Sequence, residues 1–597
     1  MTPEEFFIKN CTEYAKAFES YEKRYNQIAV LRIASALLAI VAIVYFINAR
    51  EVLVAGSILL LFLISFIALV KWHNRIKYSR DHSKHLIDIN KEELLRLSGD
   101  LSTFNEGIDF ENEKHPYSND LDVFGRNSLF QLLNRTTTVI GRKILANWLL
   151  TPASKQMIIE RNEAVKELSE QSNYCQNFEA VGKHHMDAEA NLEMLEEWLG
   201  SPNKVRNSLP LRIATILLPI AGLTILTGVI WFQLSIGYLL LILLINGIIL
   251  KTTLTYSLKI TQQTEKGVSI LSSVAALIKE VEQKEFYATL LQDIKTSFIT
   301  NGESVSTRIN KLRVVLDFLN SRANMLYQGF NLFFLIDLHM ITAAEKWKNR
   351  YGDQVYSWFD RICEFEVIVS LARFSFANPE YSYARISDES YLFDSTELGH
   401  PLIKSEERVY NHYSFSGEGS VEVITGSNMS GKSTFLRTIG INVVLALMGA
   451  PVCAKKLVVS RLQLFTSMRT KDNLEEHISS FYAELKRIEL LLQITSDSKI
   501  PVLYMLDEIL KGTNSHDRHK GAVALIKQLH KTKAFGFIST HDLELGQEAE
   551  ELTYCFNHHF SSDIVGSEII FDYKIKPGIC NSFNASSLMK NIGIEIE

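Results

Sequence analysis

Four long apolar runs, arranged as two close pairs, dominate the pattern of hydrophobic and polar positions in this 597-residue chain. A helix needs about 20 apolar residues to cross about 30 Å of hydrocarbon, and each run is near that length. Because only a few residues separate the members of each pair, the pattern predicts two transmembrane helical hairpins. The runs are "IASALLAIVAIVYFI" (33–47, extendable back to Ile28), "VLVAGSILLLFLISFIALV" (52–70), "IATILLPIAGLTILTGVIWF" (213–232) and "LSIGYLLLILLINGIIL" (234–250).

Two other interpretations of these runs compete with membrane insertion. Long helices inside a large soluble core are also apolar all round. A cleaved signal peptide fits poorly, because the polar residues 1–27 precede the first run and a second run follows it at once. Arg32 makes the first span the weakest, although such a long side chain reaches the interface from within a span.

Positive charges around the runs give an expected orientation, because Lys and Arg favour the cytoplasmic side of a membrane. Arg50 is the only basic residue in the short loops that join the two runs of each hairpin. The other basic residues lie just before or just after a hairpin: Lys23, Arg24, Arg32, Lys71, Arg75, Lys77, Arg80, Lys204, Arg206, Arg212 and Lys251. We therefore expect a multi-pass protein of the inner (cytoplasmic) membrane, with its large domains in the cytoplasm.

Outside the runs, most of the chain up to residue 378 has a helical pattern. Residues 73–100 are charged and amphipathic, which predicts a juxtamembrane helix, and residues 255–378 alternate apolar and charged positions at helical spacing. The run "FNLFFLIDLHMI" (330–341) is too short and too polar for a fifth span, so we expect it in the core. "SFSGEGSVEV" (414–423) is typical of a β-hairpin.

A phosphate-binding motif lies in "VITGSNMSGKSTFLRTIG" (423–440), which fits G-x-x-x-x-G-K-[ST] between an apolar run and a helix-compatible segment. Backbone N–H groups of such a loop close around the β-phosphate, and the helix N-terminus adds partial positive charge. Lys432 would reach the β- and γ-phosphate oxygens, and Ser433 would ligate Mg²⁺. The expected nucleotide contacts are Gly426, Ser427, Asn428, Met429, Ser430, Gly431, Lys432, Ser433 and Thr434.

Two further apolar runs end in residues suited to ATP hydrolysis. In "PVLYMLDEIL" the run ends at Asp507 and Glu508, about 75 residues after the phosphate loop. In a P-loop ATPase such a pair supplies a Mg²⁺ ligand and an acid that positions the attacking water, and we assign these roles to Asp507 and Glu508 in that order. In "FGFISTHDLEL" the run leads to His541, whose neutral imidazole would sense the γ-phosphate.

With these pieces in place, the chain resembles the MutS family of DNA mismatch repair ATPases, which belong to the ABC-type ATPases. The resemblance rests on "ITGSNMSGKSTFLR", "LDEILKGTNSHDR", "STHDLEL" and "HISSFYAEL", the last being similar to the family's S-T-F-x-x-E signature. "LDVFGRNSLFQLLNRTTTVIGRKILANWLLTP" (121–152), "RNEAVKEL", "EVIVSLARF" and "GHPLI" resemble parts of its helical core, and "IKPGICNSFNASSLMKNIGI" resembles the end of its ATPase domain. The similarity covers roughly residues 118–200 and 260–597.

The resemblance implies an α/β P-loop ATPase domain of ABC type joined to an all-α helical core and lever, here with two transmembrane hairpins. It implies ATP and Mg²⁺ as cofactors, and a homodimer in which Ser479 caps the γ-phosphate held by the partner subunit. DNA and a MutL-like protein are the partners that the family implies, in repair or recombination, and membrane lipids would be a further partner. Tyr573 would stack on the adenine, because the position where the family has an aromatic residue falls near Arg408.

The chain also departs from the family. The family's N-terminal domain inserts an aromatic residue beside a mismatched base, and the first 117 residues leave no room for it beside a membrane hairpin. We therefore expect no mismatch recognition by that route. Between Gly200 and Tyr351 much of the sequence is hydrophobic, so any DNA clamp must be short or missing.

These features divide the chain into seven expected segments. They are an N-terminal cytoplasmic helix (1–27), transmembrane hairpin 1 (28–72), a juxtamembrane helix and linker (73–117), the first part of the helical core (118–210), transmembrane hairpin 2 (211–251), the second part of the core with the lever helices (252–400), and the ATPase domain (401–597).

Composition limits the case for DNA. The net charge of −6 lacks the basic excess typical of dedicated DNA binders. The best local candidate for a DNA face is a set of basic residues interleaved with acids: Lys259, Lys266, Lys279, Lys295, Arg308, Lys311, Arg313 and Arg322. The six cysteines show no zinc-like spacing, and we expect reduced, buried thiols.

Two other functions stay open. The first is a membrane-associated ABC-type ATPase that acts on a lipid or protein partner without DNA. The apolar runs carry almost no polar residues of the kind that line transport routes, which favours anchoring over transport. The second is a scaffold with a weakened ATPase, and the intact Lys432, Asp507, Glu508 and His541 disfavour it.

Overall fold

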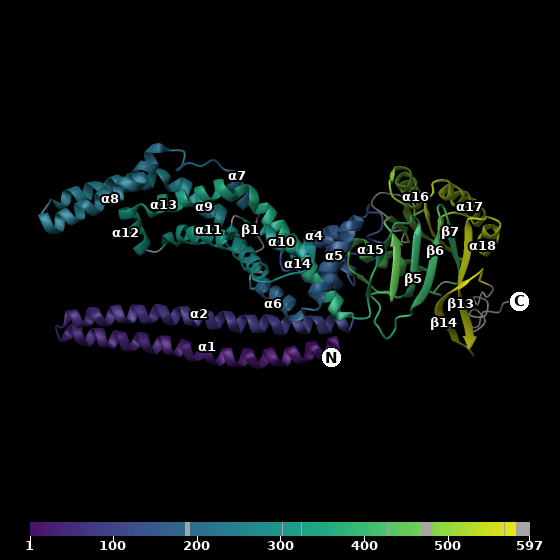
Figure 1. The fold of residues 1–597 in the computed structure, drawn as a ribbon, viewed down its shortest axis with the longest axis horizontal. Helices are drawn as coiled ribbons and strands as arrows, with labels where there is room; N and C mark the ends of the chain where they lie inside the picture. Colours follow the sequence, from purple (N-terminus) through teal and green to yellow (C-terminus); the bar gives the residue numbers. More distant parts are fainter. Residues whose placement is uncertain are drawn as a thin grey trace.

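The structure, a computed structural model, describes the whole chain except residues 185–191, 301, 324, 428, 469–479, 566–567 and 581–597. The molecule is elongated (Figure 1). A mixed α/β domain occupies one end, and long helices extend from it toward the other. Two helical hairpins, one at the N-terminus and one in the middle of the chain, extend in the same direction away from the α/β domain.

The first hairpin consists of α1 (Pro3–Asn48) and α2 (Val52–Leu97), which pack along each other. Thr2 begins α1 with a capping box, in which its side chain accepts from the Glu5 amide while the Glu5 carboxylate accepts from the Thr2 amide. Both helices run without a break from their apolar to their charged parts. The expected N-terminal helix and juxtamembrane helix are therefore extensions of the two apolar helices, because nothing between these parts stops a helix.

The second hairpin consists of α8 (Leu209–Phe232) and α9 (Ile236–Glu282). Gln233 adopts a left-handed conformation and ends α8, and the Ser235 side chain caps the start of α9. The apolar half of α9 continues as one helix into its charged half. The hairpin is thus a direct extension of the helical core.

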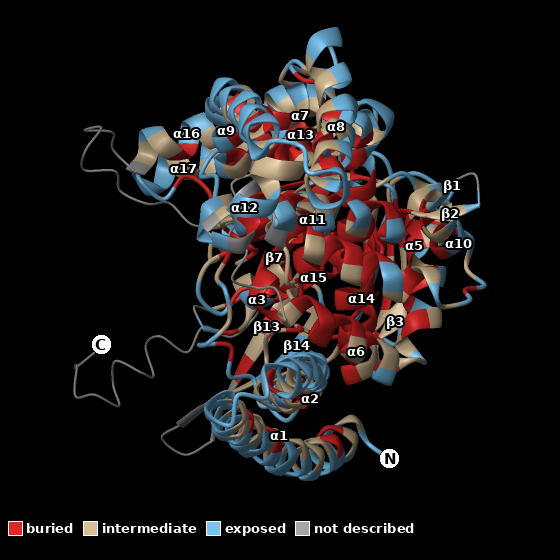
Figure 2. Cartoon of the chain, turned by 90° about the vertical axis from the view of Figure 1, so that its left-hand side faces the viewer, coloured by how far each residue is buried: buried red, intermediate tan, exposed pale blue. Residues whose placement is uncertain are grey.

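Among the described residues, four helices are long and apolar enough to cross a membrane, and they are the four expected ones. Their most apolar windows are only 6%, 6%, 17% and 11% buried within the chain, in chain order. Helices in the core of a soluble protein would be buried against neighbours. Figure 2, which looks onto the free ends of the hairpins, shows these helices largely exposed.

The helical core lies between the hairpins and the α/β domain. Its helices are α3 (Leu129–Leu133), α4 (Val139–Leu150), α5 (Lys155–Ser169), α6 (Ser172–Lys183), α7 (Leu192–Gly200), α10 (Thr289–Ser297), α11 (Val305–Asn320), α12 (Met325–Phe334), α13 (Ile336–Tyr351) and α14 (Val355–Ala377). Short 3₁₀ turns are Ile108–Phe110, Ser321–Ala323 and Gly352–Gln354, and a small ribbon joins β1 (Ile299–Thr300) to β2 (Glu303–Ser304). The central helix is α14, which packs on α4, α5 and α6 and is buried along most of its length.

The run 330–341, expected in the core, divides into two parts. Leu335 adopts a left-handed conformation and separates α12 from α13. Leu338 and Ile341 of α13 are fully buried in the core, as expected. α12 instead packs against the apolar hairpin α8 and α9, with Phe330 57% exposed. The expectation was therefore right for α13 and wrong for α12.

The α/β domain contains a six-stranded sheet in the order β10-β11-β12-β7-β13-β14. Neighbouring strands are parallel except for the antiparallel pair β13 and β14. The strands are β7 (Val421–Thr425), β10 (Gln463–Ser467), β11 (Val502–Asp507), β12 (Phe535–Thr540), β13 (Cys555–Val565) and β14 (Glu568–Pro577). The helices of this domain are α15 (Lys432–Met448), α16 (Ser480–Asp497), α17 (Ser515–Lys531) and α18 (Leu543–Glu550).

A second, four-stranded sheet has the order β4-β9-β5-β6, and β3 pairs with β8. The strands are β3 (Ser382–Tyr383), β4 (Arg385–Ser387), β5 (Leu392–Leu398), β6 (Asn411–Ser416), β8 (Pro451–Val452) and β9 (Lys456–Ser460). The expected β-hairpin at 414–423 is wrong, because β6 pairs with β5 while β7 pairs with β12 and β13. The two glycines 417 and 419 carry the chain from one sheet to the other.

Helix α15 joins the sheet to the helical core. Most of its residues are buried, and it packs on α4 and α5 as well as on β11 and β12. At its end, the Met448 carbonyl accepts a hydrogen bond of 3.0 Å from Arg161 of α5, whose guanidinium lies over the Trp148 ring. The start of α15 is the phosphate motif, so this helix connects that motif directly to the core.

Candidate functional site

The phosphate loop leaves the buried central strand β7 and returns into α15. Gly426 (φ 153°) and Gly431 (φ 106°) have backbone conformations that side-chain-bearing residues rarely adopt. Lys432 Nζ donates to the carbonyl oxygens of Gly426 at 2.7 Å and Ser427 at 3.0 Å, so the loop curls around the ammonium. The backbone therefore has the shape that the motif predicts, although Asn428 lies outside the described residues.

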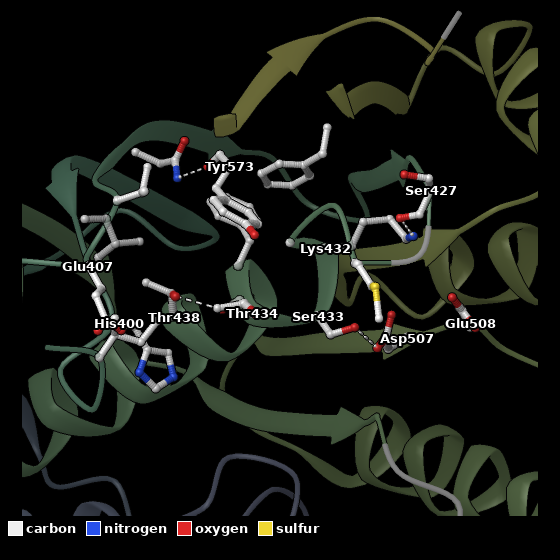
Figure 3. Close-up of a pocket in the computed structure, with 18 of the residues that line it drawn as sticks. His400, Glu407, Ser427, Lys432, Ser433, Thr434, Thr438, Asp507, Glu508 and Tyr573 are labelled. Atoms are coloured by element: carbon white, nitrogen blue, oxygen red, sulfur yellow. Dashed lines mark hydrogen bonds between the residues drawn. The ribbon is translucent and has the colours of Figure 1, made fainter. Parts of the chain in front are cut away.

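A cavity of about 770 Å³ opens over this loop (Figure 3). Its wall includes Ser427, Met429, Gly431, Lys432, Ser433 and Thr434 from the loop and α15, Asp507 and Glu508 from the end of β11, and Tyr573 from β14. Ser430 is fully buried beneath the loop. The cavity is large enough for a nucleotide. Lys432 and the loop backbone line one side of it, and the carboxylates of Asp507 and Glu508 line another.

Asp507 is fixed beside Ser433 by two hydroxyl donors. Ser433 Oγ donates to one carboxylate oxygen at 2.5 Å, and Ser539 Oγ on the paired strand β12 donates to the other. A carboxylate and a hydroxyl that converge at one edge of a sheet are the hard oxygen ligands that Mg²⁺ prefers. The side chains present therefore fit a Mg²⁺ ion next to the phosphate loop.

Glu508 lies next to Asp507 at the mouth of the cavity. Its backbone has a positive φ of 51°, and its amide donates to the Ser539 carbonyl at 3.0 Å. Its carboxylate pairs with Lys511 Nζ at 2.7 Å. A positive φ is uncommon for a residue with a side chain, and such backbone strain clusters at functional positions.

His541 follows β12 and approaches Glu508 from the side. Its Nδ1 lies 3.9 Å from Glu508 Oε1, and its side chain is 41% exposed. Both residues line a small depression beside the main cavity, whose wall does not include His541. The imidazole is therefore placed to affect Glu508 rather than to touch a nucleotide directly in this conformation.

The charged groups of the site shift one another's pKa values. Burial, the larger effect, lowers the pKa of Lys432 even though Glu508 and Asp507 act in the opposite direction. Burial alone would raise the pKa of Glu508, but the hydrogen bond and charge of Lys511 and the charge of Lys432 bring it below its usual value. Glu508 is therefore ionised at neutral pH, as a group that orients and polarises water must be.

Tyr573, the aromatic residue expected to stack on the adenine, lies in the cavity wall. Its ring lies against the phosphate loop, so that a Cβ on Gly431 would be 3.0 Å from Tyr573 Cδ1. The Tyr573 carbonyl accepts from Asn411 at 3.1 Å, which ties β14 to β6. The ring therefore faces the cavity and is 44% exposed, while Arg408 lies outside the cavity wall, over the Tyr381 ring.

Ser479 lies outside the described residues, but the end of its motif is in place. Glu484 of α16 is 5% exposed, and its carboxylate accepts from the amides of Leu510 and Lys511. This residue, which the sequence interpretation did not single out, therefore holds the loop that follows Glu508. Its position as the last residue of the signature-like "SSFYAE" was the signal that could have found it.

His400 was also missed, although it belongs to the quoted "GHPLI". It lines the cavity opposite the acids, with Glu407 and Thr438 nearby (Figure 3). Burial and the charge of Arg437 lower the pKa of His400 to about 4, so the ring is neutral at physiological pH. A neutral ring in this position offers the base or ribose of a nucleotide a hydrogen-bonding edge.

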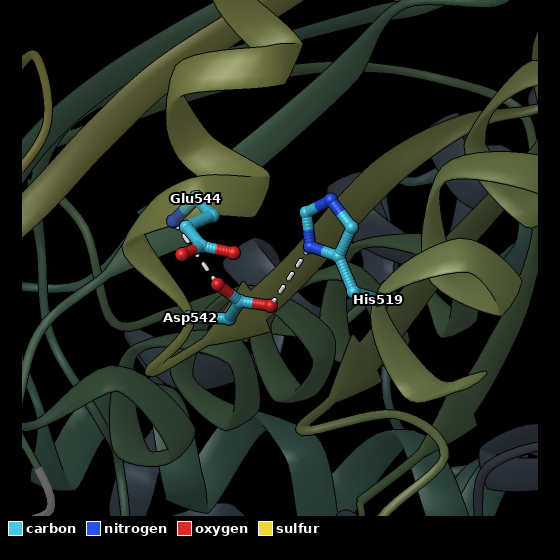
Figure 4. Close-up of side chains that lie close together, drawn as sticks. All are labelled: His519, Asp542 and Glu544. Atoms are coloured by element: carbon cyan, nitrogen blue, oxygen red, sulfur yellow. Dashed lines mark hydrogen bonds and ion pairs between the residues drawn. The ribbon is translucent and has the colours of Figure 1, made fainter. Parts of the chain in front are cut away.

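A second cluster, close to His541, contains His519, Asp542 and Glu544 (Figure 4). The ring nitrogens of His519 lie 3.1 Å from Asp542 and 2.9 Å from Glu548, and Asp542 also caps α18. The hydrogen bond with Asp542 is the main reason that the pKa of His519 is raised. Both ring nitrogens already face carboxylates of the loop and helix around α18, so this cluster joins α17 to α18.

Comparison with known proteins gives this geometry a context. The family "MutS domain V" matches residues 422–593 and "MutS domain III" matches residues 110–372. Similar proteins include the DNA mismatch repair protein MSH3 of Candida glabrata, 24% identical over 88% of this chain and 56% of that protein. The DNA mismatch repair protein MutS of Thermotoga petrophila is 23% identical over 79% of this chain and 62% of that protein. The MutS protein of Staphylococcus aureus is 28% identical over 46% of this chain and 31% of that protein.

The chain spans at most about three-fifths of the length of these relatives. The domain III match contains α8 and α9, so the second apolar hairpin lies within a domain that the family shares. The domain V match begins on β7 and contains the phosphate loop, Asp507, Glu508 and His541. Two regions of the chain therefore match domains III and V of the MutS family.

Proposed function

We propose that this protein binds and hydrolyses Mg-ATP as a dimer of MutS type, anchored in a membrane by its two apolar hairpins, and that it couples hydrolysis to DNA binding. The observation that carries the ATPase part is the convergence of Lys432, Ser433, Asp507 and Glu508 on one cavity at the end of the parallel strands. The match to domain V of the MutS family supports it.

Each residue has a distinct task in this proposal. Lys432 leaves the loop carbonyls and binds the β- and γ-phosphates, while Ser433 and Asp507 hold Mg²⁺, which neutralises phosphate charge when bound. Glu508, ionised at neutral pH, orients and polarises the water that attacks the γ-phosphate. His541, beside Glu508, responds to the loss of that phosphate, and Ser479 of the partner subunit closes the site.

The fold offers a path from this site to the far end of the molecule. α15 begins at Lys432 and ends against Arg161 of α5, and α5 packs on α14, the central helix of the core. α14 in turn packs on α9, which continues into the second hairpin. A change at the phosphates therefore has a continuous packed route to the apolar helices.

The ATPase part is tested with full-length protein in nanodiscs. Lys432→Ala removes the cation that neutralises the transferring phosphoryl group, and we expect a loss of about 100-fold or more in ATPase rate. Glu508→Gln should retain ATP binding and lose hydrolysis. Lys533→Ala, on a surface pair with Glu418 away from the cavity, is the matched control. An unchanged rate in Lys432→Ala would reject the site.

The DNA part is tested by adding duplexes, mismatched duplexes and branched junctions to the same protein. We expect at least one of them to change the Lys432-dependent rate, and the effect to disappear at high salt because phosphate contacts release counterions. A strong Lys432-dependent rate that is indifferent to every DNA would remove DNA from the proposal.

A second candidate function is the same ATPase acting on lipid or protein without DNA, and one observation favours it. Among the eight basic residues considered for a DNA face, four of those whose side chains the structure describes are paired with acids of the same chain. They are Lys295 with Glu285, Arg308 and Lys311 with Glu303, and Arg322 with Asp337. Such pairs weaken the field that would attract phosphates, so the DNA proposal rests on the family rather than on these charges.

A further inference from the structure

Helix α12 differs from the rest of the helical core in composition and in position. Residues 323–336 carry no charged side chain. α12 lies beside α8 and α9 at the end of the molecule that is far from the ATPase domain (Figure 1), and it is visible among the exposed helices in Figure 2. It is thus an apolar element next to the second hairpin, although ten residues are too few to cross a bilayer.

The contacts of α12 place its C-terminal end beside the apolar part of the hairpin. A Cβ on Gly222 of α8 would lie 3.5 Å from the Phe333 ring, and one on Gly247 of α9 would lie 3.7 Å from Leu332. At 1.5 Å per residue, Gly247 lies about 6 Å from Lys251, where the charged part of α9 begins. If α8 and α9 span a bilayer, the end of α12 therefore lies beside the base of the apolar hairpin, near the membrane boundary.

The backbone of α12 is prepared for an environment without water. The last carbonyls of any helix lack intrahelical partners, and lipid offers none. Asn246, fully buried within the apolar part of α9, donates to the carbonyl oxygens of Leu332 at 2.9 Å and Phe333 at 3.3 Å. A helix end in water would need no such donor, because water itself would bind these carbonyls.

The outer face of α12 carries large apolar side chains and one exposed amide, Gln328, which donates to the Arg322 carbonyl at 3.3 Å. Met325 is 84% exposed and Phe330 is 57% exposed, and the Phe330 ring stacks with that of Phe334 at 6.4 Å. The neighbouring helices expose side chains of the same kind, such as Leu217 and Leu240. The apolar surface of the hairpin therefore continues onto α12.

An ion pair lies beside the C-terminal turn of α12. Asp337 pairs with Arg322 at 2.8 Å and accepts from the Tyr327 hydroxyl at 2.7 Å, and its amide donates to the Asn331 side chain at 2.8 Å. These charged groups flank the uncharged segment in sequence and bind each other next to α12. Charges at this level fit the boundary of a membrane and not its interior.

We propose that α12 lies at the membrane boundary and that its exposed Met325 and Phe330 contact lipid acyl chains beside α8 and α9. This inference rests on the proposed membrane insertion of the second hairpin and adds a lipid contact that crosses no bilayer. α11 and α13 flank α12 directly, so lipid would hold the end of the lever through α12 as well as through α9.

The test is photo-crosslinking of the full chain in phosphatidylcholine liposomes that contain a lipid with a clickable acyl chain. Benzoylphenylalanine replaces one side chain at a time: Phe330 in α12, Leu240 in the apolar part of α9, and Tyr287, which is 85% exposed in the loop after α9. All three positions are exposed, so folding is little affected, and an unchanged ATPase rate confirms this.

We expect lipid adducts at positions 330 and 240, with position 287 giving less than about a tenth of their yield. Adducts at 240 without adducts at 330 would overturn the role of α12 and leave membrane insertion intact. No adducts at 240 would reject membrane insertion of this hairpin and the inference with it. Equal yields at all three positions would show nonspecific labelling and overturn the assignment of the α12 face.

Discussion

The first hairpin meets the helical core through charged and amide side chains, whereas the second meets α12 through glycines and aromatic rings. At the base of the first, Glu93 of α2 is fully buried among Arg96, Arg135 and Arg373. Next to the second, Phe333 packs over Gly222 and Leu332 over Gly247. The contacts at these two places therefore differ: charged side chains meet at the base of the first hairpin, whereas apolar packing, together with the Asn246 hydrogen bonds, joins the second hairpin to α12.

This difference indicates different mechanical roles. A buried network of charges holds only when donors and acceptors keep one geometry, since an unpaired buried charge is costly. Apolar contacts against glycine tolerate sliding, because they have no directional requirement. We therefore expect the first hairpin to be held more rigidly than the contact between the second hairpin and α12, in which only the Asn246 hydrogen bonds are directional.

Removing the central charge of the first attachment should have the largest effect. Burial alone would raise the pKa of Glu93, yet three guanidinium groups hold it well below its usual range, and burial together with Arg135 lowers the pKa of Arg96 to about 9. In Glu93→Gln these cations lose their common partner, and we expect a loss of about 3–5 kcal/mol. Thermal unfolding in nanodiscs and hydrogen exchange of α2 and α6 measure it.

The matched control is Glu92→Gln, which removes the carboxylate of the neighbouring residue on α2. That carboxylate is partly exposed and pairs with Lys183 of α6. Partly exposed pairs contribute about 0–1 kcal/mol, so this change should be nearly silent. Equal effects of the two substitutions would mean that the first hairpin is not held by the buried network, and the contrast between the hairpins would fail.

The sequence predicted these two regions to different extents. The four apolar runs and the residues Lys432, Asp507 and Glu508 follow from local patterns, because hydropathy and motif spacing act within short stretches of chain. The attachment of α2 could not be predicted, since Glu93, Arg135 and Arg373 are far apart in sequence and meet only through tertiary packing. The sequence also misplaced α12 in the core, because the burial of a short apolar helix depends on which helices pack beside it.

Packing at the second attachment gives the next prediction. A Cβ at Gly222 would make ordinary contacts with Phe333 and Ile242, so Gly222→Ala should be tolerated. The larger Gly222→Leu would force Phe333 aside, and overpacking of this kind costs about 1–3 kcal/mol. Faster hydrogen exchange of α12 in nanodiscs would report it. Gly56→Leu, in the first hairpin with nothing within 4 Å of its Cβ, should change nothing.

The donor that holds the end of α12 should matter somewhat less. Asn246→Leu leaves the Leu332 and Phe333 carbonyls without their partner, and hydrogen bonds between membrane helices contribute about 0.6 kcal/mol on average and at most about 1.7. Exchange of the α12 amides should rise while that of α11 stays unchanged. Ser65→Leu on α2, whose hydroxyl bonds only within its own turn, is the control. No change in α12 would show that Asn246 does not hold it.

The smallest expected effect is a pH dependence that separates the two attachments. Between α2 and α6, His184 stacks with His82 at 5.5 Å and meets His85 edge-on at 4.8 Å. Burial lowers the pKa of His82, and burial together with Lys183, opposed by Asp88, lowers that of His85 below the ordinary 6.5. The unfolded chain therefore binds protons at higher pH than the folded one.

The sign of the effect follows from this. The stability that these rings contribute is fully present above about pH 6.5 and declines as the pH falls toward the lower pKa values of the folded state. Between pH 7.5 and pH 5.5 we expect exchange of α2 and α6, corrected for its intrinsic pH dependence, to increase while that of α12 does not. The double variant His82→Gln and His85→Gln should lose this dependence. An equal acid response in α12 would mean that the two hairpins are not attached by different kinds of interaction.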